Sequence, residues 1–202
     1  MGEQTISMDK EGEVIDKLIA LVGGLSPLCR DKVSHVYLSQ FGSRIIPFCR
    51  KHFHICNNAD ARVDFLRWVI EYAKNNAEVV AFAIEAIGDR SAKVRRYACL
   101  VLACSGDNRA IPILTTAASA TNEPTSTDAR NAIAAIQSQD WYLFHRSDPS
   151  NRTYVLPMPH NPDYPEGANV NHFIEKACPK VVADLERILG NIYVKWKDQQ
   201  TA

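Results

Sequence analysis

The chain has 202 residues, and its 23 basic side chains equal its 23 acidic ones in number. That length is typical of one domain with its own core. The zero net charge excludes a general electrostatic attraction to nucleic acid or anionic membranes, and the sequence has no apolar run of the roughly 18 residues that a membrane-spanning helix needs.

The first residues, Met1 to Glu13, are polar and acidic and lack the basic and apolar regions of a signal peptide. We therefore expect a cytoplasmic protein. In that compartment thiols stay reduced, and three or four of the cysteines here fall on apolar helical faces. The six cysteines expected as reduced thiols are Cys29, Cys49, Cys56, Cys99, Cys104 and Cys178.

Three helices are predicted before residue 57. The first runs from Glu13 to Val22 and ends at Gly23-Gly24, since glycine favours helix ends. The second opens at Ser26-Pro27, where serine can cap and proline suits the first turn, and stops at Gly42. The third extends from about Ser43 to Cys56. Loops this short favour antiparallel neighbours.

The third helix contains the residues most like a metal site. In a continuous helix Cys49, His52 and Cys56 would share a face, and thiolate and imidazole are zinc ligands. However, the spacing matches no common zinc finger, and one helix cannot easily arrange its own side chains in a tetrahedron. We favour an ordinary core stripe that includes Cys49, Phe53 and Cys56, and we expect neither metal nor cofactor.

A fourth helix should be capped by Asn57 or Asn58, bury Phe65, Trp68, Val69 and Tyr72, and end at Asn75-Asn76. From Ala77 to Ile136 the chain predicts a succession of short amphipathic helices. The one from Ser91 to Ser105 has apolar residues at helical spacing: Val94, Tyr97, Ala98, Val101 and Leu102.

Two Gly-Asp pairs, Gly88-Asp89 and Gly106-Asp107, separate these short helices. We expect both glycines to adopt the left-handed conformation that ends a helix. Ser91 and Asp107 should cap the helices that follow, and Pro112 falls in a first turn, where a missing N–H is tolerated. No such helix closes a core alone, so neighbours must stack.

Three segments resemble a HEAT repeat of the short bacterial-lyase type: Ala86-Ile87-Gly88-Asp89, Val94-Arg95 through Leu102, and Gly106-Asp107 through Leu114. Asp128 to Ile136 forms a weaker copy. The resemblance implies an all-α fold, a HEAT/ARM-like right-handed α-solenoid of antiparallel helix pairs covering residues 13–138 of a single domain, 1–202. It also implies that Asp89, Arg95 and Asp107 form a scaffold and not a site.

Lys93, Arg96 and Arg130 form a possible secondary basic face. A charge cluster of this size is usually a solvated surface, so nucleic-acid binding is unexpected. HEAT-like folds nevertheless occur in DNA alkyl-base glycosylases and bilin lyases. The alternative function that the resemblance allows is an enzyme of the first type, using the basic face and Trp68, or a bilin-lyase-like protein.

Residues 140–169 depart from the helical pattern and hold five of the chain's ten prolines. The β-prone runs Trp141–Phe144 and Thr153–Leu156 flank a turn signal, which predicts a small hairpin followed by a Pro-rich strap. These side chains either seal the end of the stack or bind a partner. The predicted partner-binding residues are Trp141, Tyr142, Phe144, His145, Arg146, Arg152 and Tyr154.

Residues 170–197 predict an amphipathic helix, with apolar positions from Val181 to Trp196, that caps the last repeat. The sequence contains no Gly-rich phosphate loop, nucleophile elbow or zinc-helix motif. We therefore predict a non-enzymatic protein-binding module. The most specific form of this prediction is a cognate inhibitor, such as a bacterial immunity protein that occludes a toxin.

Overall fold

The computed structural model describes residues 3–119 and 123–146, and every regular element within these ranges is helical. The all-α class is therefore confirmed for the described part of the chain. None of its helices is both long and apolar enough to cross a bilayer. The chain divides into two compact units, residues 1–55 with 162–202 and residues 56–161.

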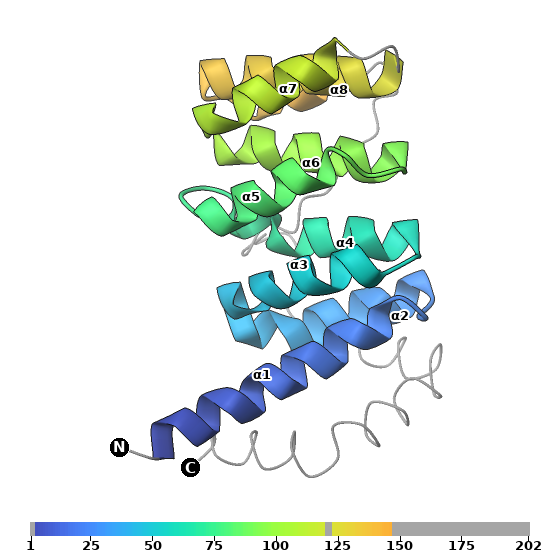
Figure 1. Ribbon diagram of the computed structural model, residues 1–202, viewed down its shortest axis with the longest axis vertical. Coiled ribbons are helices and arrows are strands. Elements are labelled where there is room, and N and C mark those ends of the chain that lie inside the picture. Colours follow the sequence, from blue (N-terminus) through green and yellow to red (C-terminus); the bar gives the residue numbers. More distant parts are fainter. Residues whose placement is uncertain (1–2, 120–122, 147–202) are drawn as a thin grey trace, which may run out of the picture. The chain divides into compact units, whose positions relative to one another are not determined.

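The first unit contains α1 (Glu3–Val22), α2 (Pro27–Lys32), the π-helical turn η1 (Val33–Leu38), the 3₁₀ turn η2 (Ser39–Ile45) and α3 (Ile46–Ile55) (Figure 1). Helix α1 begins at Glu3 and not at Glu13, so the polar N-terminal residues extend the predicted helix. The predicted second helix is a series of α, π and 3₁₀ turns. It is interrupted at Gly42 (φ 56°, ψ −140°), where the sequence predicted a stop.

Helix α1 packs on α3 through apolar side chains and through one carboxylate. Asp16 Oδ1 lies 2.8 Å from both Lys51 Nζ and His52 Nε2. Burial on its own raises the pKa of Asp16, but the hydrogen bonds from Lys51 and His52 outweigh it and lower the pKa. Cys29 is disulfide-bonded, so the expectation of six reduced thiols is wrong at this position.

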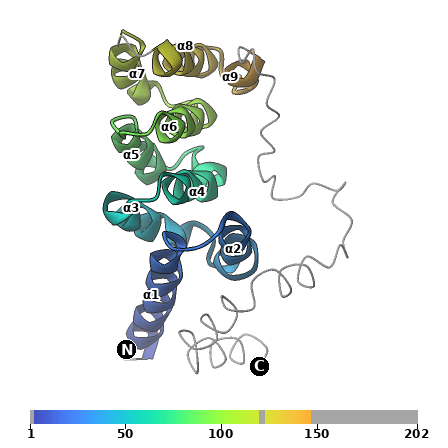
Figure 2. The same ribbon diagram turned by 90° about the vertical axis from the view of Figure 1, so that its right-hand side faces the viewer.

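The second unit contains α4 (Ala59–Val69), the 3₁₀ turn η3 (Ile70–Tyr72), α5 (Ala77–Ala86), α6 (Ala92–Ser105), the 3₁₀ turn η4 (Asn108–Ala110), α7 (Ile111–Ala118), α8 (Glu123–Ser138) and α9 (Tyr142–Arg146). Helices α4, α6 and α8 pack side by side in one layer, while α5 packs on α6 and α7 on α8 in a second layer (Figure 2). A single helix cannot shield its own apolar face from water. The apolar side chains of the two layers therefore pack against each other and form the core between them.

One type of turn recurs where the chain leaves the first layer. Asn75, Gly106 and Gln139 all have positive φ, and each precedes an Asn or Asp. Within the three pairs, Asn76, Asp107 and Asp140 accept a hydrogen bond through Oδ1 from the backbone N–H two residues ahead. Gly106 and Gln139 are 33 residues apart, close to the length of known helical repeats.

Gly88 and Gly106 are therefore not equivalent, although the sequence suggested that they were. Gly106 has φ 62° at the end of α6, as expected, but Gly88 is not among the described glycines with positive φ. Helix α5 ends instead through hydrogen bonds from the Ile87, Gly88 and Asp89 N–H groups to earlier carbonyls. The Ser91 side chain makes no capping hydrogen bond either. Its N–H donates to Asp89 Oδ1 at 2.7 Å.

Substitution by alanine should destabilise the protein more at Gly106 than at Gly88. Gly106→Ala should lower the free energy of unfolding by about 1–2 kcal/mol, because a Cβ disfavours left-handed backbone. The new Cβ would also lie 3.0 Å from Gln139 Oε1. Gly88→Ala is the matched control: its Cβ would meet Glu85 O at an ordinary 3.5 Å, so the change should stay within about 0.5 kcal/mol. Urea denaturation measures both, and equal losses would contradict the assignment.

Candidate protein-binding surface

The predicted strand Trp141–Phe144 is not a strand: Trp141 lies in a turn, and Tyr142 to Phe144 belong to helix α9, which corrects the first arm of the expected hairpin. The chain turns at Asp140, whose Oδ1 accepts a hydrogen bond from the Tyr142 N–H at 3.1 Å and so caps the N-terminus of α9. The local cap and the burial of Phe144, which is 2% exposed, override the β preference of the aromatic run. The second arm, Thr153–Leu156, lies outside the described residues.

Two aromatic rings at the start of α9 form the candidate surface. The rings of Trp141 and Tyr142 are stacked, with centroids 4.0 Å apart and planes 26° from parallel. Tyr142 is 55% exposed. Among the described residues the other exposed large hydrophobic side chain is Ile55, which belongs to the first unit. Trp141 is half-buried. A solvent-facing ring that is already held by stacking loses little entropy on binding, which suits an interface.

The direction of α9 depends on the junction at Gln139. The Gln139 N–H donates to Ile136 O and the Asp140 N–H to Ala135 O, the hydrogen bonds that define a Schellman helix end. This end usually contains glycine, yet Gln139 has φ 55°. Its side-chain Nε2 donates to Gly106 O at 3.0 Å and to Ile136 O at 2.8 Å. These hydrogen bonds offset the backbone strain and tie the start of α9 to the end of α6.

The structure brings only part of the predicted partner-binding set to this surface. Trp141 and Tyr142 form the stacked pair, while Phe144 is buried and anchors α9. His145 and Arg146 belong to α9 by their backbone. Arg152 and Tyr154 lie outside the described residues. Gln139 and Asp140, which hold the pair in place, were missed as functional residues. The sequence signal for Asp140 was an Asx residue two positions before an aromatic.

The possible basic face carries its own counter-charges. Lys93 Nζ lies 2.5 Å from Asp60 Oδ1, and Arg96 Nη1 lies 3.6 Å from Asp128 Oδ1. Arg130 donates to Ala118 O at 3.4 Å and to Thr127 Oγ1 at 3.2 Å. The first two contacts link α6 to its neighbours α4 and α8. Trp68 is 6% exposed and lies edge-on to Phe65, so its ring is not available to stack on a base.

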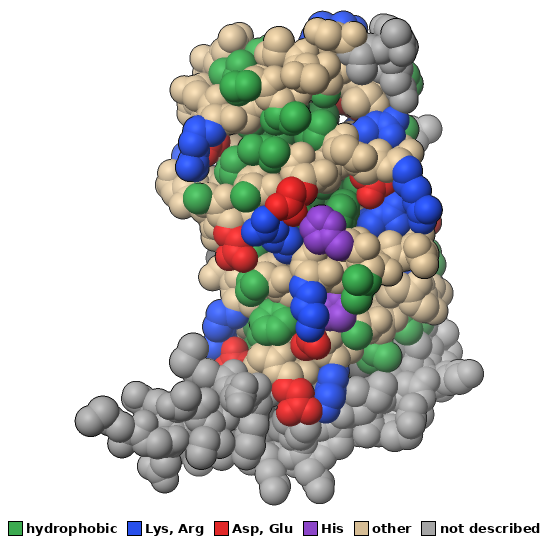
Figure 3. Space-filling view, in the orientation of Figure 1, with side chains coloured by type: hydrophobic (Ala, Val, Ile, Leu, Met, Phe, Trp, Pro, Cys, Tyr) green, Lys and Arg blue, Asp and Glu red, His purple; other side chains and the backbone are tan. Residues whose placement is uncertain are grey.

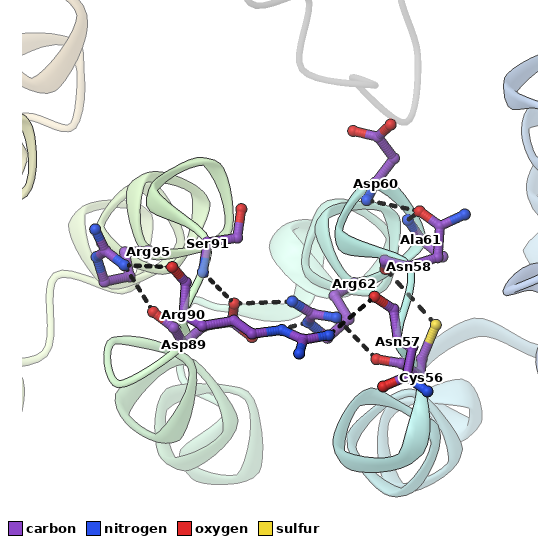
Figure 4. A network of polar contacts seen from close by, with 10 residues as sticks. All are labelled: Cys56, Asn57, Asn58, Asp60, Ala61, Arg62, Asp89, Arg90, Ser91 and Arg95. Carbon is purple, nitrogen blue, oxygen red and sulfur yellow. Dashed lines mark hydrogen bonds and ion pairs between the residues drawn. The ribbon is translucent and has the colours of Figure 1, made fainter.

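A buried ion pair fixes the turn between α5 and α6 (Figure 4). Arg62 donates from Nε and Nη2 to the two carboxylate oxygens of Asp89, at 2.8 and 3.0 Å, and from Nη1 to Cys56 O at 2.8 Å. The Arg62 and Asp89 side chains are 4% and 8% exposed. Burial raises the pKa of Asp89, but the hydrogen bonds from Arg62 and the Ser91 N–H lower it overall. Arg62 was not predicted from the sequence. The feature that points to it is a basic residue within the run of buried residues on α4.

Arg95 completes this polar network without touching the Asp89 carboxylate. It donates to the backbone oxygens of Asp89 and Arg90 at 2.8 and 3.1 Å, and to Thr125 Oγ1 on α8 at 2.9 Å. Asp107 accepts from the Arg109 backbone and guanidinium, which lower its pKa. Asp89, Arg95 and Asp107 therefore hold the turns and link the helices, as expected for a scaffold.

The weak metal candidates behave as separate residues. Cys49 is fully buried, which raises its pKa and disfavours the thiolate that a metal needs. His52 is bound to Asp16, and Cys56 follows the end of α3 and is not on its face. The described residues contain no group of three or more His, Cys, Asp or Glu side chains suited to a metal ion. Burial likewise raises the pKa of Cys99 and Cys104 to about 12.

The aromatic pair at the start of α9 is thus the candidate binding feature of the second unit. Family models, curated proteins and solved structures were compared with the chain, and none of them matches it.

Proposed function

We propose that the protein is a non-enzymatic binding module whose second unit is a short HEAT-type α-solenoid, and that it binds another protein through α9. The observation that carries the proposal is the stacked Trp141–Tyr142 pair, in which the Tyr142 ring stays 55% exposed and Trp141 is half-buried. Exposing such a pair is unfavourable in water, and an interface recovers that free energy. Aromatic side chains of this type are also the usual energetic centres of protein interfaces.

The scaffold around the pair supports this proposal. Phe144 anchors α9 in the core, Asp140 caps it, and Gln139 ties its start to Gly106. A surface held in this way is pre-organised, which reduces the entropy lost when a partner binds. The more specific form of the proposal is a cognate inhibitor, such as an immunity protein that occludes a toxin. The small size and zero net charge of the chain suit a protein that acts by covering one surface of one partner.

The alternative, a nucleic-acid-binding enzyme on the same type of scaffold, gains no support from the basic residues. Lys93 and Arg96 each face an aspartate, so their charges are compensated within the unit. Trp68 is buried in the core. Phosphate contacts would have to displace these ion pairs. We therefore retain the protein-binding proposal.

The proposal is tested with the protein encoded by the adjacent gene as the candidate partner. The full-length chain should bind it in a one-to-one complex in isothermal titration calorimetry. Tyr142→Ala or Trp141→Ala should weaken binding about 30-fold or more, because truncating such an anchor removes 2 kcal/mol or more. Gln137→Ala, an exposed position on α8, is the control and should bind like the unmodified chain.

Circular dichroism should show that each variant keeps its helical content. If Tyr142→Ala and Trp141→Ala both bind the partner as tightly as the unmodified chain, then α9 is not the interface. If the two purified proteins form no complex while the adjacent gene does encode a toxin, the inhibitor form of the proposal is wrong.

A further inference from the structure

Cys29 is a residue that neither the helical stack nor the proposed partner surface explains. It is disulfide-bonded. The other cysteines of the described residues are free: Cys49, Cys56, Cys99 and Cys104. The sequence contains six cysteines, and the sixth is Cys178. Since a disulfide joins two cysteines, Cys178 is the one residue left in this chain that can pair with Cys29.

The free cysteines are also poor competitors for this bond. The thiolate is the form that attacks a disulfide. Burial raises the pKa of Cys49, and it raises the pKa of Cys99 and of Cys104 to about 12, so these thiols stay protonated at neutral pH. Cys56 belongs to the second unit, where its Sγ donates to Asn58 O at 3.6 Å.

The surroundings of Cys29 show what a covalent link would stabilise. Cys29 is 4% exposed and lies in the first turn of α2, a helix of six residues that continues directly into η1. Ser26 precedes α2 but makes no capping bond to the backbone, and its hydroxyl donates to Cys29 Sγ at 3.0 Å. Arg30 Nη1 donates to Leu25 O at 2.7 Å. The first turn of α2 thus has no side-chain cap, and a bond at Cys29 restrains it instead.

The longer helices of the first unit are joined by ion pairs. Arg44 Nη1 lies 2.6 Å from Glu11 Oε1, and Asp16 accepts from both Lys51 and His52. On the face drawn in Figure 3, Lys and Arg side chains lie beside Asp, Glu and His side chains over α1 and α3. Because these contacts join α1 to η2 and α3, loss of the disulfide should loosen α2 and leave α3 in place.

We infer that Cys29 and Cys178 form an intrachain disulfide that ties the C-terminal segment to α2. The helix predicted over residues 170–197, which lies outside the described residues, was expected to cap the last repeat. Residues 162–202 instead belong to the same compact unit as residues 1–55, so both cysteines fall in the first unit. The apolar stripe from Val181 to Trp196 starts three positions after Cys178. This segment therefore completes the first unit.

Formation of the bond requires an oxidant. Each thiol gives up one proton, and the two sulfur atoms together give up two electrons as the S–S bond forms. A small-molecule disulfide such as oxidised glutathione accepts these protons and electrons and leaves as two thiols, through a mixed disulfide with one of the two cysteines.

Non-reducing peptide mapping of the full-length chain tests the pairing. After incubation with oxidised glutathione, free thiols are blocked with N-ethylmaleimide in denaturant, and the chain is digested with trypsin. The expected product is a disulfide-linked pair of the peptides 18–30 and 177–180, which separates on reduction, while the other four cysteines are blocked. The oxidised chain should run as a monomer on a non-reducing gel. A blocked Cys29, a link from Cys29 to any other cysteine, or a disulfide-linked dimer would overturn the inference.

Cys178→Ser should lower the thermal midpoint of the oxidised chain by about 5–15 °C, because the bond joins residues 149 positions apart and restricts the unfolded chain. Cys29→Ser should lose at least as much, since Cys29 is also buried. The double variant should lose no more than Cys29→Ser, because all three lack the same bond. Hydrogen exchange in Cys178→Ser should accelerate in α2 and stay slow in α3.

Cys104→Ser is the matched control, because it removes a free thiol. It should keep the linked peptides, and its midpoint should fall when the chain is unfolded and refolded with reductant, as that of the unmodified chain does. The midpoint of Cys178→Ser should not depend on reductant. If Cys178→Ser melts like the unmodified oxidised chain, or if the losses of the two single variants add in the double variant, then Cys29 does not pair with Cys178. Partner binding through α9 concerns the other unit and does not bear on this result.

Discussion

Asp89→Ala should lower the free energy of unfolding by about 3–5 kcal/mol. The substitution leaves the Arg62 guanidinium buried and without its carboxylate, and an uncompensated buried charge is far less favourable than the intact pair. It also removes the acceptor of the Ser91 N–H at the turn before α6. Guanidinium chloride denaturation, followed by circular dichroism, measures the loss.

Asp60→Ala is the matched control for this prediction. The pair between Asp60 and Lys93 also joins α4 to the chain around α6, but it is a single contact whose side chains are 53% and 60% exposed, so its loss should amount to less than about 1 kcal/mol. Adding Arg62→Met to Asp89→Ala should recover much of the stability, because the orphaned charge is removed. If Asp89→Ala and Asp60→Ala lower the free energy of unfolding equally, then burial does not determine how much the Arg62–Asp89 pair stabilises the fold.

The pH dependence of stability gives the same prediction a second check. The folded-state pKa of Asp89 is lowered, so its contribution is present above the unfolded-state pKa of about 3.9 and is lost as the pH falls through the folded value. The unmodified chain should therefore lose stability below about pH 4, and Asp89→Asn should show a shallower decline. Asp16 and Asp107 shift in the same direction, so the decline should not vanish.

Phe144→Ala should release α9 from α8. Truncating a fully buried phenylalanine removes about 3–5 kcal/mol of packing. A helix of five residues has no stability of its own, so it stays helical only while it is docked. We expect hydrogen exchange of the α9 amides to accelerate and the fluorescence of Trp141 to shift, while α4 to α8 remain folded.

Tyr142→Ala serves as the control for α9 docking, because it truncates an aromatic ring of the same helix that is exposed and not buried. It should leave the amide protection of α9 close to that of the unmodified chain. Equal protection in Phe144→Ala and the unmodified chain would mean that α9 is held by its cap and the Gln139 junction alone. In that case the anchor role of Phe144 would be wrong.

The helices of the second unit could be predicted largely because their signals are local. Asn58 accepts hydrogen bonds from the Asp60 and Ala61 N–H groups, and Asp107 caps as expected, since each needs only its own following residues. Gly106 is left-handed for the same reason. Gly88 has the same neighbour in sequence, yet its helix ends differently because the Asp89 carboxylate is held by Arg62, 27 residues earlier.

The candidate site was harder to predict, because contacts distant in sequence decide it. The run Trp141–Phe144 has high β propensity, and nothing local shows that Phe144 reaches a helical core. Whether a given aromatic is an anchor or an exposed contact likewise depends on the packing against α8. The left-handed conformation of Gln139 has no sequence signature, since its partner is the carbonyl of Gly106 in the preceding repeat.

Nearest-neighbour stacking has a consequence for how the second unit can change over time. Helix α4 packs on α6 and α6 on α8. A substitution on α9 therefore changes the packing of α8 but has little effect on the Arg62–Asp89 pair. If α9 is the partner surface, as proposed above, its exposed residues can be substituted while the packing of α4 and α6 is unchanged. Such a division suits a protein whose target is itself changing.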